Sequence, residues 1–154
     1  MVDLSAANKL PPRADDLFRI FARFEFALKM AGLAKMRGSM VVVKWDEFAE
    51  CKVVGEPFVD KLRQEGVCPL LFAKPPQTEI VSDGRYDFEV VDPPTTATEL
   101  FGAVRRVRNN LFHGGKYFDD DRDRNEQLVA EAIAVLLLAV VRRDDVLYFF
   151  EGRV

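Results

Sequence analysis

The sequence of 154 residues is poor in the side chains that most metal and redox sites need, with two cysteines and one histidine. Sixteen residues separate Cys51 from Cys68, which excludes a structural zinc site and favours no disulfide. We therefore expect two reduced, buried thiols, as is usual in a cytosolic protein. A glycine-rich phosphate loop, paired metal-ligand spacing and a serine nucleophile elbow are also absent from the sequence. We expect neither a bound metal nor another cofactor.

Long hydrophobic runs are missing as well. The longest, 132–141, has ten residues, which is half of the roughly 20 that a membrane-spanning helix needs. The first twelve residues include Asp3 and Lys9 and lack the apolar core of a secretory signal. These features predict a cytoplasmic protein that does not enter a membrane.

The overall composition is that of a globular chain, with 49% hydrophobic and 31% charged residues. A chain of this length buries enough surface to form one domain, here expected over 1–154, without a metal or disulfide. The formal net charge of −3 argues against a protein that coats nucleic acid unspecifically, but it allows a local basic site.

Apolar residues recur every three or four positions in several segments, a spacing typical of amphipathic helices. The predicted helices cover 15–35, a short segment from Trp45, then 56–65, 95–112 and 125–143. The last of these is apolar nearly all round, so we expect it at the centre of a bundle. The apolar tail 146–150 should pack back on the bundle or meet a partner.

Prolines interrupt the stretch 69–94 and exclude a long helix there. Inside it, Asp83-Gly84 separates two alternating, β-rich segments, which is a good hairpin signal. The predicted fold is therefore an all-α bundle of four to five helices, with a small β-hairpin insertion at about 69–94.

The segment 105–116 contains four basic residues and the only histidine, without a carboxylate, in an otherwise acidic chain. At about 100° per residue, Arg105, Asn109 and His113 lie along one stripe of a helix, and Arg108 lies about 140° from His113. Arg108 and His113 can then meet on one ligand only if the last turn unwinds or if a second copy of the helix faces the first.

These residue types suit phosphate chemistry. Histidine takes and gives protons near neutral pH, and arginine grips a phosphate with two parallel hydrogen bonds. Asn109 could orient the imidazole or hold a phosphate oxygen. The ordinary alternative is that His113 complements the negative end of its helix and that the arginines form a solvated face.

The string Arg108-Asn109-Asn110-Leu111-Phe112-His113 resembles the Arg-x4-6-His motif of the HEPN (higher eukaryotes and prokaryotes nucleotide-binding) family, in which a polar residue follows the arginine. Its place at the end of an amphipathic helix and before a long apolar helix also fits, as does Phe24-Glu25-Phe26 in the first helix. The resemblance extends over roughly 14–66 and 95–143, and it makes 69–94 an insertion.

The resemblance implies an HEPN-like fold and a metal-independent endoribonuclease that works as a homodimer, with both motifs lining one cleft. Arg108 would stabilise the scissile phosphate, His113 would transfer a proton at the 2′-hydroxyl or the leaving oxygen, and Asn109 would support them. The products would be a 2′,3′-cyclic phosphate and a 5′-hydroxyl. A toxin or phage-defence role would follow, and the partners would be RNA and an antitoxin.

Three further residues are candidates for RNA binding. Arg105 and Lys116 would hold backbone phosphates, or they are ordinary surface residues. Glu25 would contribute from the first helix, or it is a solvated or ion-paired carboxylate. Toxin members that a nucleotidyltransferase antitoxin modifies carry a tyrosine two residues after the histidine, where this sequence has Gly115.

Two other functions fit the same residues. One is a catalytically silent HEPN-like module that binds RNA or a nucleotide, in which loss of His113 would weaken binding and abolish no reaction. The other is a structural partner-docking domain, in which charge changes at Arg108 would have no measurable effect.

Overall fold

The computed structural model describes residues 1–113 and 121–153. This part of the chain is mostly helical, with 55% helix and 12% strand. The elements are α1 (Ala14–Met30), β1 (Ala34–Arg37), β2 (Met40–Val43), α2 (Trp45–Ala49), α3 (Gly55–Glu65), α4 (Pro69–Ala73), β3 (Thr78–Ser82), β4 (Arg85–Glu89), α5 (Ala97–Phe112), α6 (Arg122–Val140) and α7 (Asp144–Phe150).

The expectation of a helical chain with a hairpin is confirmed, but four to five helices was too few. The described residues form seven, because α4 and α7 are short helices in segments where the sequence predicted none. A second hairpin, β1–β2, was also missed. The helix predicted to reach residue 35 ends at Met30, since Gly32 adopts a left-handed φ of 84° and turns the chain into β1. The apolar stretch from Met40 then forms β2.

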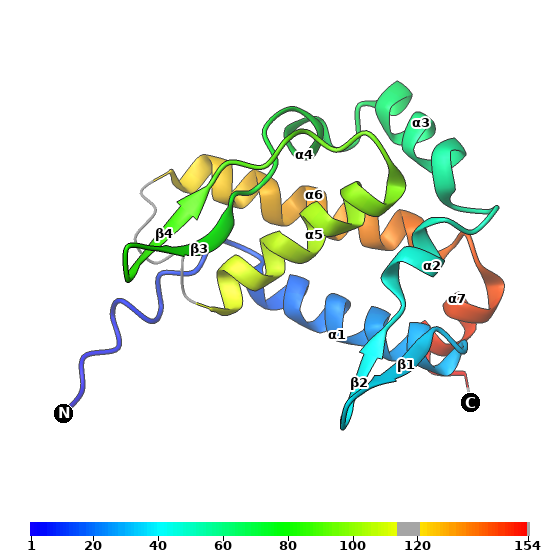
Figure 1. Cartoon of the computed structure of the whole chain (residues 1–154), viewed down its shortest axis with the longest axis horizontal. Helices are drawn as coiled ribbons and strands as arrows, with labels where there is room; N and C mark the ends of the chain where they lie inside the picture. Colours follow the sequence, from blue (N-terminus) through cyan, green and yellow to red (C-terminus); the bar gives the residue numbers. More distant parts are fainter. Residues whose placement is uncertain (114–120, 154) are drawn as a thin grey trace.

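Helix α6 lies at the centre, as its apolar composition predicted (Figure 1). It packs against α1, α4, α5 and α7, and the buried apolar residues of all seven described helices form one cluster. The tail packs back as α7 against α1, where the Arg23 guanidinium donates hydrogen bonds to the carbonyl oxygens of Phe149 (2.6 Å) and Phe150 (2.8 Å). In the part of the chain that is described, no helix is both long and apolar enough to cross a membrane.

A cluster of aromatic rings joins four helices. Adjacent ring centroids lie 5.4–6.1 Å apart. Its members are Phe21 and Phe24 of α1, Trp45 and Phe48 of α2, Phe58 of α3, and Phe101 of α5. All six side chains are buried, so the cluster fixes how α1 and α5 lie against one another.

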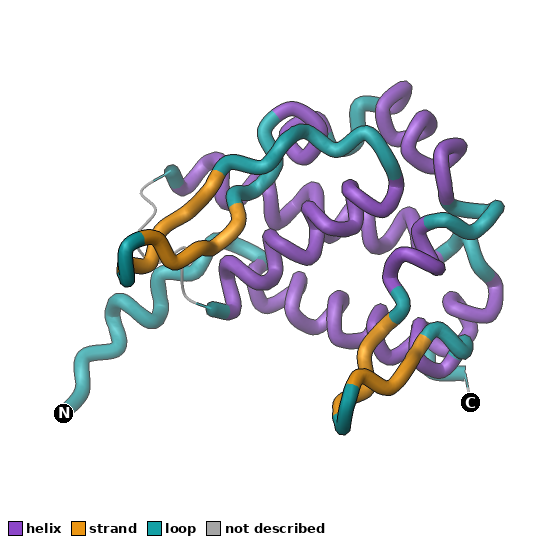
Figure 2. The backbone as a smooth tube through the Cα atoms, viewed as in Figure 1, coloured by secondary structure: helices purple, strands orange, loops and turns teal. Residues whose placement is uncertain are grey.

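The predicted hairpin is confirmed as β3–β4. Ser82 pairs with Arg85 across a two-residue turn, in which Asp83 (φ 50°) and Gly84 (φ 71°) both have the positive φ of a type I′ turn. The Tyr86 and Phe88 rings lie on one face, 5.4 Å apart. The two hairpins extend from opposite ends of the helical body (Figure 2).

One buried carboxylate holds α4 to the central helix. Glu131 of α6 is 5% exposed, and its oxygens accept hydrogen bonds from the backbone N–H groups of Leu70 (3.1 Å) and Leu71 (2.8 Å). The Gln127 side-chain amide donates to it as well, at 2.8 Å. Glu131 thus satisfies N–H groups that the first turn of α4 cannot pair internally.

The two cysteines are free thiols in different environments. Cys68 is fully buried, and burial, with the nearby negative Glu131, raises the pKa of its thiol to about 12. Cys51 is only half-buried. The expectation of buried thiols is therefore confirmed for Cys68 alone.

We predict that Glu131→Gln lowers the free energy of unfolding by about 1–3 kcal/mol, because an amide nitrogen would replace one of the two acceptors and face a buried N–H group. Urea denaturation followed by circular dichroism measures this. Glu126→Gln, on the exposed side of the same helix, is the control and should leave the midpoint unchanged. Equal effects of both substitutions would show that the buried hydrogen bonds contribute nothing specific.

Candidate functional site

Helix α5 carries the motif and has well-defined ends. At its start, Thr96 and Glu99 form a capping box, in which each side chain accepts a hydrogen bond from the other's backbone N–H at 3.2 Å. Hydrogen bonds to Glu99, first from the Thr95 backbone, lower the pKa of its carboxyl group. At its end, His113 is the C-cap, and its backbone N–H donates to the Asn109 carbonyl at 2.8 Å. The predicted helix over 95–112 is confirmed.

The basic residues of α5 divide between two faces. Arg106 and Asn110 face the base of the β3–β4 hairpin, where Arg106 Nε donates to the Pro76 carbonyl (3.1 Å) and Asn110 Nδ2 to the Gln77 carbonyl (2.9 Å). Desolvation lowers the pKa of the half-buried Arg106. Because both side chains hold the hairpin, they belong to the fold rather than to a ligand site.

Arg105 and Arg108 lie on the face of α5 that is turned toward α1 and α2. The guanidinium carbon of Arg108 is 4.5 Å from the centroid of the Phe21 ring, and that of Arg105 is 5.7 Å from the Trp45 ring. These are cation–π contacts, which leave the N–H groups free to bind an anion. Within the described ranges, neither arginine forms an ion pair with a carboxylate.

Glu25 has a structural partner that the sequence did not indicate. Its carboxylate accepts a hydrogen bond from the buried Trp45 indole, with Nε1 and Oε1 3.1 Å apart. The donor is a neutral ring 20 residues away in the sequence, rather than the charged partner of an ion pair. Arg105, Trp45 and Glu25 thus form one contact series between α5, α2 and α1.

The end of α5 presents two exposed rings. His113 and Phe112 are both exposed, with ring centroids 5.7 Å apart, and Phe112 also lies against Phe18 of α1 at 6.2 Å. Among the described residues, no hydrogen bond joins the side chains of Arg108, Asn109 and His113. These three side chains are therefore not joined directly to one another within one chain. Lys116 lies outside the described residues.

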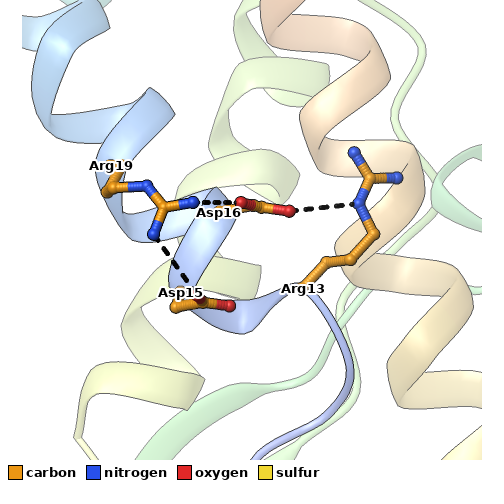
Figure 3. Close-up of polar contacts among 4 residues, drawn as sticks. All are labelled: Arg13, Asp15, Asp16 and Arg19. Atoms are coloured by element: carbon orange, nitrogen blue, oxygen red, sulfur yellow. Dashed lines mark hydrogen bonds and ion pairs between the residues drawn. The ribbon is translucent and has the colours of Figure 1, made fainter.

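Helices α1 and α5 run antiparallel, since Phe18 touches Phe112 while Phe21 lies under Arg108. The first turn of α1, next to Phe18, carries Asp15 and Asp16, and both already pair with arginines of their own segment (Figure 3). Arg19 pairs with both, at 3.3 Å from Asp15, and Arg13 lies 3.5 Å from Asp16. These carboxylates are therefore neutralised by arginines other than Arg108.

The sequence did not indicate that aromatic rings lie beneath Arg105 and Arg108 and beside Phe112. Phe18 and Phe21 looked like ordinary core positions of an amphipathic helix, and Trp45 gave no sign of a polar partner. The contact of Arg108 with Phe21 depends on how α1 and α5, which are far apart in the sequence, pack against one another. In the described part of the chain, no cluster of three or more His, Cys, Asp or Glu side chains could hold a metal ion.

We predict that the two neighbouring asparagines have separate roles. Asn110→Ala should lower the free energy of unfolding by about 1–3 kcal/mol, because it leaves the Gln77 carbonyl without its buried donor. Asn109→Ala should change stability by less than about 0.5 kcal/mol, since the side chain is half-exposed. Thermal unfolding of both variants compares them. A larger loss for Asn109→Ala would contradict this division.

We compared the chain with protein-family models, with curated proteins and with solved structures, and none of the three comparisons found a match. The functional assignment therefore depends on the residues of α5 and the surfaces around them.

Proposed function

We propose that this chain is a metal-independent endoribonuclease of the HEPN type that acts as a homodimer. The observation that carries the proposal is the environment of the Arg108 guanidinium. It lies on the Phe21 ring near the end of α5 and has no carboxylate partner among the described residues. A half-buried cation kept free in this way suits a phosphate ligand. His113, five residues later, is also exposed.

The arrangement of elements supports the family assignment. The motif occupies the last turns of α5 and precedes the long central helix α6, and α1 packs against both. The β3–β4 hairpin lies to one side, tied to α5 by Arg106 and Asn110, so it is an addition that leaves the motif accessible. These features are those that the resemblance implies for an HEPN-like bundle.

The chemistry would be an internal transfer at phosphorus. The 2′-oxygen attacks the adjacent phosphorus and the bond to the 5′-oxygen breaks, which leaves a 2′,3′-cyclic phosphate and a 5′-hydroxyl. His113 accepts the proton of the 2′-hydroxyl and then delivers a proton to the leaving 5′-oxygen. Arg108 stabilises the charge that develops on the phosphate oxygens, and Asn109 holds the substrate or the imidazole.

A homodimer follows from the separation of these groups. Because Arg108 and His113 lie about 140° apart around an ideal helix, a second α5 facing the first would bring an arginine of one copy to the histidine of the other. Arg105 would then add a backbone phosphate contact. An enzyme that cuts cellular RNA needs restraint, so we further propose a toxin or phage-defence role with an antitoxin partner.

The central test is cleavage of total RNA and of tRNA by the purified protein in excess EDTA. We expect cutting by the wild type, a loss of at least about a hundredfold for Arg108→Ala and His113→Ala, and a smaller loss for Asn109→Ala. Arg37→Ala, an exposed arginine in β1 at the other end of the molecule, is the matched control and should cut normally.

Other results would support the rival functions. RNA retained by a folded wild-type protein that never cuts it would indicate the silent binding module. Neither cutting nor retention would indicate a docking domain. Cutting that disappears in EDTA would contradict the metal-independent mechanism.

The composite site makes a separate prediction. Arg108→Ala and His113→Ala proteins, each inactive alone, should recover part of the activity when mixed, because a mixed dimer brings one intact arginine to one intact histidine. Single-turnover cleavage after subunit exchange measures this, and the double variant mixed with wild type controls for dilution. No recovery, despite demonstrated exchange, would mean that each chain must supply both residues.

A further inference from the structure

Phe112 is unusually exposed for its residue type. It is 70% exposed, more than any other described aromatic side chain, whereas Tyr86 comes next at 54%. It is the last residue of α5 and lies between Phe18 and His113, at centroid distances of 6.2 and 5.7 Å. The ring is therefore held in place by two neighbours and still open to solvent.

The surroundings of Phe112 point to a ligand with both a planar ring and a negative charge. Arg108 lies four residues earlier, so the two side chains are neighbours on the surface of α5. Arg108 is bound to the Phe21 ring rather than to a carboxylate, and the nearby acids of α1 are paired with Arg13 and Arg19. An open aromatic ring beside an available cation is the combination that binds single-stranded nucleic acid.

We propose that Phe112 is a stacking platform for an unpaired base of the RNA, with Arg108 on an adjacent phosphate. The proposal rests on the ribonuclease function above and defines its substrate class as single-stranded RNA or the unpaired loop of a folded RNA. Bases inside a duplex are already stacked on one another, so they cannot reach the ring without being unpaired.

The test measures binding apart from cutting. The probes are a fluorescein-labelled single-stranded RNA and a duplex of the same sequence, both fully 2′-O-methylated so that no 2′-hydroxyl is left to attack. Anisotropy titrations compare wild type with Phe112→Ala and Phe112→Trp. Phe26→Ala is the matched control. Phe26 is also an exposed ring beside an arginine, Arg23, but it lies in the second half of α1, whereas Phe112 contacts Phe18 in the first half.

We expect Phe112→Ala to weaken binding of the single strand by about tenfold to a hundredfold, the effect of one lost base–aromatic stack. Phe112→Trp should retain the affinity, and Phe26→Ala should match the wild type. Duplex binding should be weak for every variant and nearly independent of residue 112. Size-exclusion chromatography, run in parallel, reports whether the substitution changes the oligomeric state.

Several outcomes would overturn the proposal. One is unchanged RNA binding by Phe112→Ala, and another is an equal loss of affinity for the single strand and the duplex. A third is that Phe112→Ala and Phe112→Trp both lose RNA affinity because the dimer dissociates. A wild type that binds neither probe overturns it together with the proposed function. Phe112-dependent binding by a protein that cuts no RNA would overturn the ribonuclease alone.

Discussion

The stacked aromatic rings of α1, α2, α3 and α5 are the constraint on which the candidate site depends. The Phe24 and Trp45 rings lie nearly parallel, and Phe101 joins them to Phe48 and Phe58, so these helices are held together by large buried surfaces. Such rings have few low-energy arrangements, which fixes the orientation of α5 as well as its position. The same packing places Phe21 under Arg108 and Trp45 under Arg105.

The fold uses its charged and polar side chains in two ways, and the difference defines the site. Some side chains hydrogen-bond to backbone groups that would otherwise be buried without partners, namely Glu131, Arg106 and Asn110, and Glu25 accepts a hydrogen bond from the Trp45 indole. Asp15 and Asp16 are paired with arginines of the same segment. What is left at the end of α5 is a small basic and aromatic surface on a protein of net charge −3. This surface is what the ribonuclease proposal and the stacking proposal both use.

Local patterns predicted much of the fold. The helical spacing over 95–112, the Asp83-Gly84 turn and the helix over 56–65 were interpreted correctly, because each depends on interactions between residues close in sequence. The β1–β2 hairpin was missed, since its strands are short and Ala34 continues the apolar periodicity of α1. The motif residues Arg108 and His113 were recognisable from their spacing, but their surroundings were not.

From the sequence alone, five of the seven described helices, the turn of the hairpin in 69–94 and the side chains able to carry phosphate chemistry could be predicted. The packing of the helices against one another set the remaining features: Glu25 binds Trp45, Arg106 and Asn110 hold a hairpin, and Arg108 lies on an aromatic ring while Phe112 stays open. The two sets of features differ in how far apart along the sequence the interacting residues lie. Turns and helical periodicity arise within a few residues along the chain, whereas these contacts join groups 20 to 94 positions apart, which only the packing of helices brings together.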